Sequence, residues 1–476
     1  MKPAIRRREV LQGGLAATLM PAIARAAIAP RGPETVIVAG AGLAGLAAAY
    51  RLRETGRRVI VLEARSEPGG RVRTIRAPFD DGVYGEAGAA RISDVHHFVL
   101  HWLNNMRLNA VPFSPPEGRT LFVMDTMRGF ADDPAAIERL AGNLRQAERG
   151  LTPGELANLY LENLPESLAR ADADADAMRG WAPLDAMAWP QWLAARGASE
   201  GAVRLLTLGA DSRDISALYV LRQIFLHRAG RGYFKIEGGM DRLPRAMAAE
   251  LAGDLRYNCE VMGVSHGPQG VRVSYREAGE AKSVDGARVI LAIPFSLLRK
   301  ITIDPPFSPA KRMVVESLPY RSATRFLLQT DRSFWREAGL SGAARTDAPC
   351  EIWDASFGQL SVRGLLSVTA GGQPERREQL ARLDEAGQLS LGLGMARGAF
   401  PEIDNHYQKG FTQNWTDDPW SQGAFAVFHP GQMTAWGDIL GRPEGRVHFA
   451  GEHASPWPGW MEGAVWSAER VVQEIL

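Results

Sequence analysis

The stretch of residues 34–71 constrains the fold of this chain more than any other. An apolar run, VIV, leads into a G-x-G-x-x-G turn formed by Gly40, Gly42 and Gly45, and an alanine- and leucine-rich segment follows the turn. A second apolar run then ends at Glu63. Strand, glycine turn, helix, strand and acid stand in the order that a dinucleotide-binding βαβ unit requires, whereas a glycine turn alone would also fit an unrelated α/β protein.

The spacing gives each of these residues a physical role. Gly40 permits the tight turn, Gly42 lets the backbone approach a pyrophosphate, and Gly45 lets helix and strand pack closely. The N–H groups at the start of the helix are then available to the phosphates. Glu63 lies 18 residues after Gly45, where its carboxylate accepts from ribose hydroxyls and repels a 2′-phosphate.

Length, charge and cysteine content narrow the class of protein. The 476 residues predict two or three domains, and the net charge of +1 gives no case for nucleic-acid binding. Two cysteines, Cys259 and Cys350, exclude a disulfide framework and a four-cysteine metal site, and we expect two buried free thiols rather than one disulfide. We therefore expect small molecules or protein as partners, and no metal, nucleic acid or membrane.

The first 30 residues resemble a twin-arginine export signal. Arg7 and Arg8 precede a mildly apolar stretch over 13–23, and the small residues on both sides of Arg25 form a cleavage site. A disordered basic tail is the alternative. No other stretch approaches the roughly 18 apolar residues of a membrane-spanning helix. We expect a periplasmic or secreted protein.

The rest of the chain is a mixture of predicted helices and strands. Apolar residues at three- and four-residue spacing predict a mainly helical region over 95–229, and short apolar runs over 322–430 are typical of an antiparallel sheet. Two runs within 259–275, joined by HGPQG, predict a pair of strands, and the last helix is expected over 461–475. Patterns that belong with the first βαβ unit recur in the middle and at the end, so we expect a nucleotide domain assembled from three separated segments.

Five segments far apart in the chain carry a more specific signal. They read VIVAGAGLAGLAAA, VLEARSEPGGRV, IEGGMDRLP, TRFLLQTDRSFW and RVHFAGEHASPWPGWMEGAVWSAERV. In this order they resemble the flavin-dependent amine oxidases, the family of monoamine oxidase and L-amino acid oxidase, and among them most closely the L-amino acid oxidases. The resemblance implies an FAD held non-covalently in an extended shape, with the substrate oxidised against the flavin ring.

The resemblance also implies a fold and a division into domains. The fold is α/β, with a Rossmann-like FAD-binding domain of the GR2 type built from discontinuous segments, an α+β substrate domain with an antiparallel sheet, and a helical subdomain. After the export signal at 1–30, we expect the FAD-binding domain at 31–80, 237–305 and 440–476, the substrate-binding domain at 81–125 and 306–439, and the helical subdomain at 126–236.

The same resemblance assigns the cofactor contacts. The glycine turn faces the pyrophosphate, Glu63 the adenosine ribose, and Val261 the adenine. The backbone N–H of Met461 meets the flavin, where a donor favours negative charge on the reduced ring. The position of the family's flavin-linking cysteine is Ala424 here, so no covalent bond to the flavin is expected. The expected contacts are Gly40, Gly42, Ala44, Gly45, Glu63, Ala64, Arg65, Gly70, Arg71, Ala89, Ala90, Arg91, Val261, Gly451, Glu452, Trp460, Met461 and Ala464.

Arg91 carries the prediction of substrate class. In family members that act on α-amino acids, a stretch of small residues before an arginine, as in GAARI, supplies the guanidinium that binds the substrate carboxylate. Arginine suits this task because its planar fork binds a carboxylate at two points. A surface or structural arginine is the alternative.

Four other positions complete the predicted catalytic set. Phe425 and Trp460 match the two aromatic residues that face each other before the flavin, and Gly459 directly precedes the second; packing in a core is the alternative for the aromatic pair. Arg325 stands where the family usually has a lysine that holds a water against the flavin. Since arginine does not act as a proton carrier, rapid reaction of the reduced flavin with oxygen is in doubt.

A few positions near the expected pocket stay open. Asp354 falls close to a family tyrosine that helps hold the carboxylate, and Trp353, one residue earlier, is the alternative for that position. Gln223 and His227 lie in the segment that covers the pocket in relatives, and we expect His227 to be structural, as a lone helical histidine usually is.

The predicted function is oxidative deamination of an L-amino acid, with hydride transfer from Cα to flavin N5, to a 2-oxo acid, ammonia and hydrogen peroxide. A periplasmic electron acceptor in place of oxygen is an open alternative. The nearest rival is oxidation of a monoamine or polyamine without a carboxylate, and a flavoprotein without turnover is the rival from another class. The oligomeric state is open, with a homodimer among the alternatives.

Overall fold

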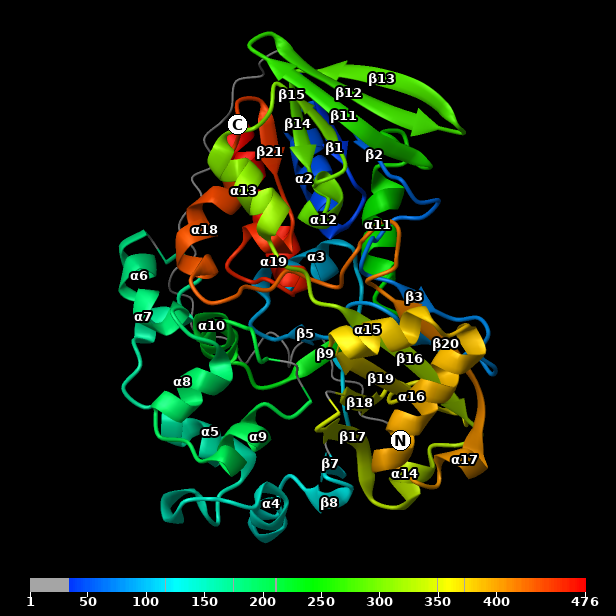
Figure 1. The fold of residues 1–476 in the computed structure, drawn as a ribbon. Helices are drawn as coiled ribbons and strands as arrows, with labels where there is room; N and C mark the ends of the chain where they lie inside the picture. The colour runs from blue at the N-terminus through cyan, green and yellow to red at the C-terminus, as the bar shows by residue number, and fades with distance from the viewer. Residues whose placement is uncertain (1–33, 116, 174, 210–211, 349, 372) are drawn as a thin grey trace.

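The computed structural model describes residues 34–476 except 116, 174, 210–211, 349 and 372. The predicted export signal at 1–30 lies outside the described residues. A parallel sheet and its helices form the upper part of Figure 1, and a helical part and a second large sheet lie below it. Within the described residues, no helix has the length and apolar character needed to cross a membrane.

β1 (Thr35–Ala39) lies at the centre of a five-stranded sheet in which all neighbours are parallel. Its strands come from the start, the middle and the end of the chain, which confirms the predicted discontinuous assembly. Ligands bind such sheets where the strand order reverses, which is beside β1. The order is β10 (Leu255–Arg256), β2 (Arg58–Leu62), β1, β14 (Arg288–Leu291) and β21 (Val447–Phe449).

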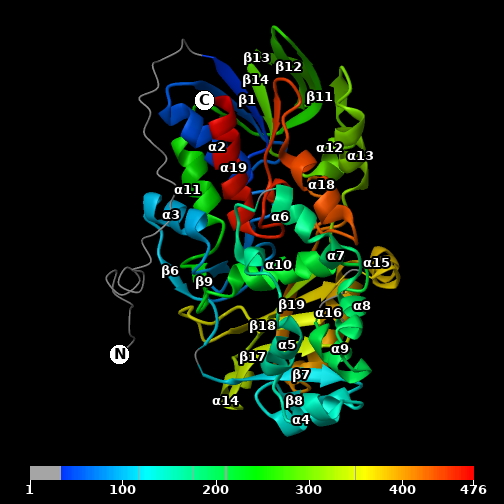
Figure 2. The same ribbon diagram turned by 90° about the vertical axis from the view of Figure 1, so that its left-hand side faces the viewer.

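The apolar run in β1 is continuous because both faces of the sheet are covered. Val36 and Val38 belong to a core shared with helices from three parts of the chain, whereas Ile37 and Ala39 belong to the core on the opposite face. Figure 2 shows these helices together on one side of β1. They are α2 (Leu43–Glu54), α11 (Arg242–Glu250) and α19 (Met461–Ile475).

A four-stranded sheet extends from the parallel sheet at the top of Figure 1. The two strands predicted within 259–275 form its hairpin and are longer than predicted. The order is β13 (Glu280–Gly286), β12 (Gly270–Glu277), β11 (Cys259–Gly267) and β15 (Thr302–Asp304).

A seven-stranded sheet forms the wall of the lower part. The strands between 322 and 430 are antiparallel to one another, as predicted, but β17 pairs in parallel with β7. The order is β20 (Tyr407–Asn414), β16 (Ala323–Thr330), β19 (Gly364–Gly371), β18 (Cys350–Asp354), β17 (Leu340–Thr346), β7 (Arg119–Met124) and β8 (Met127–Phe130).

The region 95–229 is mainly helical, as predicted, but it also contains three strands between 110 and 130 that were not predicted, because the unbroken run LFVM has no clear period. Within 322–430, no helix was predicted over the segment LSLGLGM, which alternates apolar and small residues and lies in helix α16 (Glu385–Ala399). Gly392 of this helix packs directly on the ring of Phe326, and that tertiary contact overrides the local pattern.

The helical part consists of short helices, several of which have a side chain that caps the N-terminus. Thr152, Ser199 and Ser216 each accept a hydrogen bond from a backbone N–H in the first turn of their helix. The last of these helices, α10, reaches the centre of the molecule. The elements are α4 (Pro134–Ala141), η1 (Gln146–Glu148), α5 (Pro153–Leu161), η2 (Glu166–Ala169), α6 (Ala175–Gly180), α7 (Ala182–Asp185), α8 (Trp189–Ala195), α9 (Glu200–Leu206) and α10 (Ala217–His227).

Short elements connect the three parts. Cys259 and Cys350 are buried free thiols, as predicted, and the predicted domain limits stay a prediction. The connecting strands are β3 (Thr74–Ile75), β4 (Gly85–Glu86), β5 (Ile92–Ser93), β6 (Ala110–Pro112) and β9 (Tyr233–Ile236). The remaining helices are α3 (His97–Asn105), α12 (Phe295–Leu298), α13 (Pro309–Ser317), α14 (Phe334–Glu337), α15 (Pro374–Ala381), α17 (Ile403–His406), α18 (Gln432–Gly441) and η3 (Glu452–Ala454).

Candidate active site

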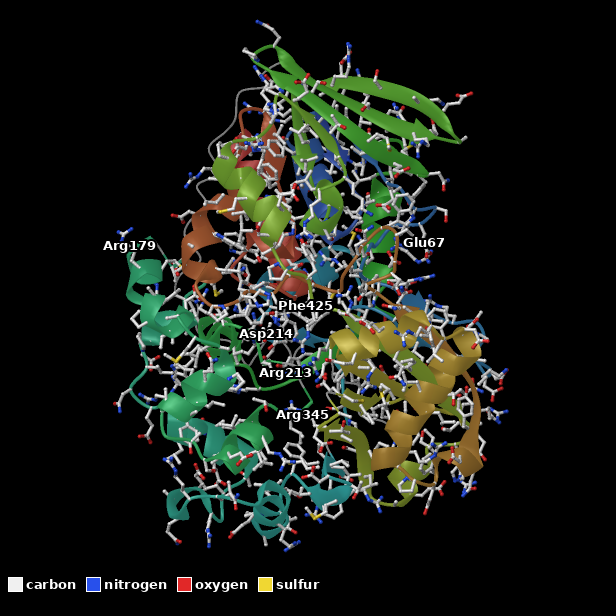
Figure 3. All side chains as sticks on the ribbon, viewed as in Figure 1. Glu67, Arg179, Arg213, Asp214, Arg345 and Phe425 are labelled. Atoms are coloured by element: carbon white, nitrogen blue, oxygen red, sulfur yellow. The ribbon has the colours of Figure 1, made fainter. Side chains whose placement is uncertain are left out.

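A cavity of about 1010 Å³ extends from the glycine turn after β1 to the seven-stranded sheet. Its walls come from the parallel sheet, from α10 and from β16, β18 and β19. Figure 3 labels Phe425, which lines this cavity, at the level where the upper and lower parts meet. The cavity has two ends, a nucleotide end at the glycine turn and a substrate end at the seven-stranded sheet.

The three glycines of the turn meet different surroundings. Gly40 has a φ of +101°, a conformation that favours glycine. A Cβ on Gly45 would lie 1.9 Å from the Gly40 carbonyl oxygen, and Gly45 does not line the cavity. The missing side chain of Gly45 therefore serves the packing of helix on strand, as its spacing predicts, and its contact with the pyrophosphate stays a prediction. A Cβ on Gly42 would meet no atom within 4 Å, which leaves its backbone open to the cavity.

Glu63 follows β2 directly and lines the nucleotide end of the cavity, where the sequence predicts an acidic residue. Its carboxylate accepts from the backbone N–H of Ala41 at 2.6 Å and of Arg65 at 2.9 Å. Burial raises the pKa of Glu63, and these N–H donors oppose the shift. The Arg65 guanidinium pairs with Asp418 at 2.6 Å, so this residue is held in place.

Glu452 ties the turn after β21 to two distant segments. It accepts from Arg71 at 2.8 Å, from the backbone N–H of Ala426 at 3.1 Å and from that of Gly459 at 2.8 Å. Both carboxylate oxygens are thereby used, and Glu452 is buried. The contact with Gly459 fixes the backbone two residues before α19. Met461, the first residue of this helix, lines the cavity.

The predicted site residues gather in this one cavity, with Gly45 as the exception. Arg91, Arg325, Phe425, Gly459 and Trp460, the predicted catalytic set, all line it. The predicted cofactor contacts that line it are Gly40, Gly42, Ala44, Glu63, Ala64, Arg65, Gly70, Arg71, Ala89, Ala90, Arg91, Val261, Gly451, Glu452, Trp460, Met461 and Ala464.

Arg91 lies at the substrate end and faces an acidic residue that the sequence analysis did not single out. Its Nη1 and Nη2 donate to Oε1 and Oε2 of Glu351 at 3.2 and 3.5 Å. The guanidinium also lies 5.4 to 5.9 Å from the ring centroids of Tyr233, Phe113 and Trp460. The Glu351 carboxylate raises the pKa of Arg91 although burial opposes this.

The alternation of β18 decides between Trp353 and Asp354. Glu351 and Trp353 lie on one face of the strand and line the cavity. Asp354 lies on the other face, buried, and accepts from Trp335 Nε1 at 2.9 Å and from Arg336. Asp354 is therefore structural, and Trp353 faces the substrate end. The same alternation, read in CEIWD, would have found Glu351.

Arg325 extends along the wall beside Trp353. Its guanidinium carbon lies 4.2 Å from the Trp353 ring centroid, and it donates to Ser367 Oγ and the Gly88 carbonyl at 3.2 and 3.3 Å. Burial lowers the pKa of Arg325 to about 10, so the group stays charged at neutral pH. Arg325 Nε and Thr369 Oγ1 are buried without a partner among the described residues, which fits a bound molecule or water in the cavity.

Trp460 is fixed by a hydrogen-bonded chain that includes His227. Its Nε1 donates to Gln223 Oε1 at 2.6 Å. His227 Nδ1 lies 2.7 Å from the backbone carbonyl oxygen of Gln223. Because a carbonyl oxygen only accepts, Nδ1 carries the proton. His227 Nε2 then accepts from His96 Nε2 at 2.9 Å, and His96 Nδ1 accepts from the Ser93 N–H at 3.1 Å.

His96 and His227, the two histidines of this hydrogen-bonded series, are neutral. Burial and the neighbouring His227 lower the pKa of His96 to about 3, and burial lowers that of His227. The ring centroids of His227 and Trp460 are 4.5 Å apart. His227 therefore has a structural role, as expected: its ring packs against Trp460. A partner such as His96 carries no sequence signal, because 131 residues separate it from His227.

Comparison with known proteins identifies the family. Residues 43–476 match the flavin containing amine oxidoreductases. The chain belongs to this family. The open backbone at Gly42, the buried Glu63 and the cavity that runs from them past Met461 fit a flavin nucleotide, so the predicted family is confirmed.

Among curated proteins, the chain is 30% identical over 462 residues to the putative L-amino-acid oxidase YobN of Bacillus subtilis (strain 168), covering 93% of this chain and 95% of that protein. It is 26% identical over 456 residues to the L-amino acid oxidase Lm29 of Lachesis muta, covering 93% and 87%. These similarities extend over nearly the whole described chain.

Solved structures show the same fold. Putrescine oxidase bound to putrescine superimposes with a TM-score of 0.76 at 22% identity, covering 94% of this chain and 99% of that one. Cyclohexylamine oxidase from Brevibacterium oxydans IH-35A gives a TM-score of 0.77 at 24% identity, covering 93% and 100%. The predicted fold class is confirmed, while the sequence relatives and the structural neighbours differ in the substrates their names carry.

Proposed function

We propose that this member of the amine oxidoreductase family oxidises L-amino acids to 2-oxo acids and ammonia. The observation that carries the proposal is Arg91, a guanidinium in the wall of the substrate end. The names of the sequence relatives, L-amino-acid oxidases, support it. A carboxylate bound to the planar fork of Arg91 fixes the substrate at two points, which positions its Cα–H in the cavity.

The residues of the substrate end divide the work between binding and shielding. Arg91 binds the α-carboxylate, and Phe425, Trp460 and Trp353 offer apolar surface that displaces water from the amine. Two electrons and two protons leave the Cα–N unit to give an imino acid, and water then replaces the imino nitrogen to release ammonia. Bound flavin supplies the acceptor for the two electrons.

The proposal also covers the cofactor, the final electron acceptor and the location of the enzyme. FAD without a covalent bond is supported by Glu63 and by Ala424, which lines the cavity where monoamine oxidases have a cysteine. Oxygen is the proposed final acceptor, with hydrogen peroxide as product, and an electron-transfer protein is the alternative that Arg325 keeps open. Export through the twin-arginine route rests on Arg7 and Arg8, and we propose a periplasmic or secreted enzyme.

The wild-type holoenzyme tests the proposal with a substrate panel. Each L-amino acid is mixed anaerobically with the enzyme beside its decarboxylated amine and its D-isomer, and bleaching of the flavin absorption is followed; the aerobic series records peroxide. Because two charged hydrogen bonds hold the carboxylate, L-amino acids should bleach the flavin about 100-fold faster than the amines.

Two results would contradict the proposal. Amines that bleach the flavin as fast as the amino acids would favour a monoamine or polyamine oxidase, as the names of the structural neighbours suggest. No bleaching by any compound would favour a flavoprotein without turnover.

A further inference from the structure

The carboxylate of Glu351 has no task in the oxidation proposed above, yet it lines the substrate end. The other described acidic residues of the cavity wall, Glu63, Glu260 and Glu452, lie on the segments of the nucleotide end. Both oxygens of Glu351 face both terminal nitrogens of Arg91, at 3.2 and 3.5 Å. Glu351 thus occupies the donors that a substrate carboxylate needs.

A substrate carboxylate on Arg91 therefore brings two anions to one guanidinium. Both side chains of the pair are only about a third exposed, 34% and 29%, so water screens the repulsion poorly. Uptake of a proton by Glu351 does not relieve it. Burial would raise the pKa of Glu351, but Arg91, Arg345 and Arg325 hold it below its usual range.

The neighbouring guanidiniums are poor replacements for Arg91. Arg325 is committed to Ser367 and the Gly88 carbonyl and stacks on Trp353. Arg345 lies directly opposite Glu351 in the β17–β18 pair, but its side chain is exposed, lies outside the residues that line the cavity and makes no hydrogen bond or ion pair with Glu351 among the described residues; Figure 3 shows it below Phe425. A cation brought by the substrate is therefore the partner that can reach Glu351 from inside the cavity.

We infer that Glu351 selects L-amino acids with a cationic side chain: Arg91 binds the α-carboxylate, and Glu351 binds the distal ammonium or guanidinium. The inference rests on the proposed amino-acid oxidation. Trp353, on the same face of β18, and Phe113, whose ring centroid is 6.0 Å from it, provide apolar surface for the methylene stem of such a side chain.

Pairs of substrates that differ in one charge test this in the wild-type enzyme. L-arginine is compared with L-citrulline and L-lysine with L-norleucine, by anaerobic flavin bleaching and by kcat/KM. We expect the cationic member of each pair to be favoured at least about tenfold, as a hydrogen bond to a charged group implies.

Glu351→Gln keeps the shape and removes the charge. In this variant the preference should fall to about one, while L-citrulline and L-norleucine react as well as before or better. Glu378→Gln, which removes a carboxylate that is 70% exposed on α15, is the matched control and should keep the wild-type preference.

Binding without chemistry is measured with α-methyl-L-ornithine, which has no Cα–H, against α-methyl-L-norvaline. The rise in the melting temperature of the wild-type holoenzyme should be larger with the cationic compound. This arm needs no variant, so it decides the matter even if Glu351→Gln does not fold.

Several outcomes would overturn the inference while amino-acid oxidation stands. These are equal rates within both pairs, a preference for L-glutamate, or a Glu351→Gln variant that improves all amino acids alike, which would make Glu351 only a competitor for Arg91. If instead amines bleach the flavin and amino acids do not, the proposed function itself fails, and the inference fails with it.

Discussion

The two ends of the cavity are built by different means. At the nucleotide end, Gly42 and Glu63 belong to one continuous βαβ unit, and the open backbone of Gly42 lines the cavity. At the substrate end, Arg91 meets Glu351 across 260 residues of sequence. Local spacing therefore determines the first end, and long-range pairing of strands determines the second.

The largest effect should come from the glycine that serves packing. Gly45→Ala places a Cβ 1.9 Å from the Gly40 carbonyl oxygen, where backbone has to move, so the free energy of unfolding should drop by about 3 kcal/mol or more. Gly42→Ala has open space and should leave that free energy nearly unchanged while weakening flavin binding. Thermal unfolding and flavin content of both variants are measured; equal stability losses would contradict the division between packing and binding.

The second-largest effect should come from loss of the buried Glu452 charge, which joins three chain segments. Glu452→Gln leaves the Arg71 guanidinium and two backbone N–H groups facing an amide, and the free energy of unfolding should fall by about 3 kcal/mol, with loss of flavin. Glu54→Gln, in an exposed pair with Arg51, is the control and should cost less than about 1 kcal/mol. Chemical denaturation measures both, and similar costs would show that Glu452 does not join the segments.

The comparison explains what was predictable from sequence. β1, β2 and α2 were predicted because continuous apolar runs and the glycine turn follow each other within a short stretch of sequence, and Arg91, Trp460 and the start of α19 were found through short motifs. Glu351 and His96 were not singled out, since their partners lie 260 and 131 residues away. The helix α16 was not predicted, because its alternating apolar and small residues have no helical period. Its position depends on the packing of Gly392 against the ring of Phe326, which the sequence does not reveal.

Acid stability tests the histidine pair that supports Trp460. His96 has a pKa of about 3 when folded, below the value of about 6.5 expected when unfolded, so the folded state binds fewer protons between these values. Its contribution is complete above pH 6.5 and is lost as the pH falls, by about 1.4 kcal/mol per unit.

The variant His96→Asn isolates this contribution from those of other groups. The fall in the free energy of unfolding from pH 7 to 4 should be smaller in the variant than in the wild type. His101→Asn, on the exposed side of α3, should keep the wild-type slope. Equal slopes in all three proteins would refute a neutral buried pair.

The smallest effect concerns the electron acceptor. Arg325→Lys loses the stacking on Trp353 but keeps a charge, so anaerobic reduction of the flavin by substrate should change little. We expect turnover with oxygen, relative to turnover with an artificial dye, to rise severalfold, because lysine is the usual residue of the family here. An unchanged ratio would show that Arg325 does not limit the reaction of the reduced flavin with oxygen.

The most direct test of the central claim is Arg91→Ala with one amino acid that the wild type oxidises and its decarboxylated amine. We predict that kcat/KM falls about 100-fold or more for the amino acid and changes little for the amine, because only the amino acid loses a bound carboxylate. Arg382→Ala, which removes an exposed guanidinium next to α15, should affect neither strongly. Equal losses for both compounds in Arg91→Ala would contradict the carboxylate-binding role of Arg91.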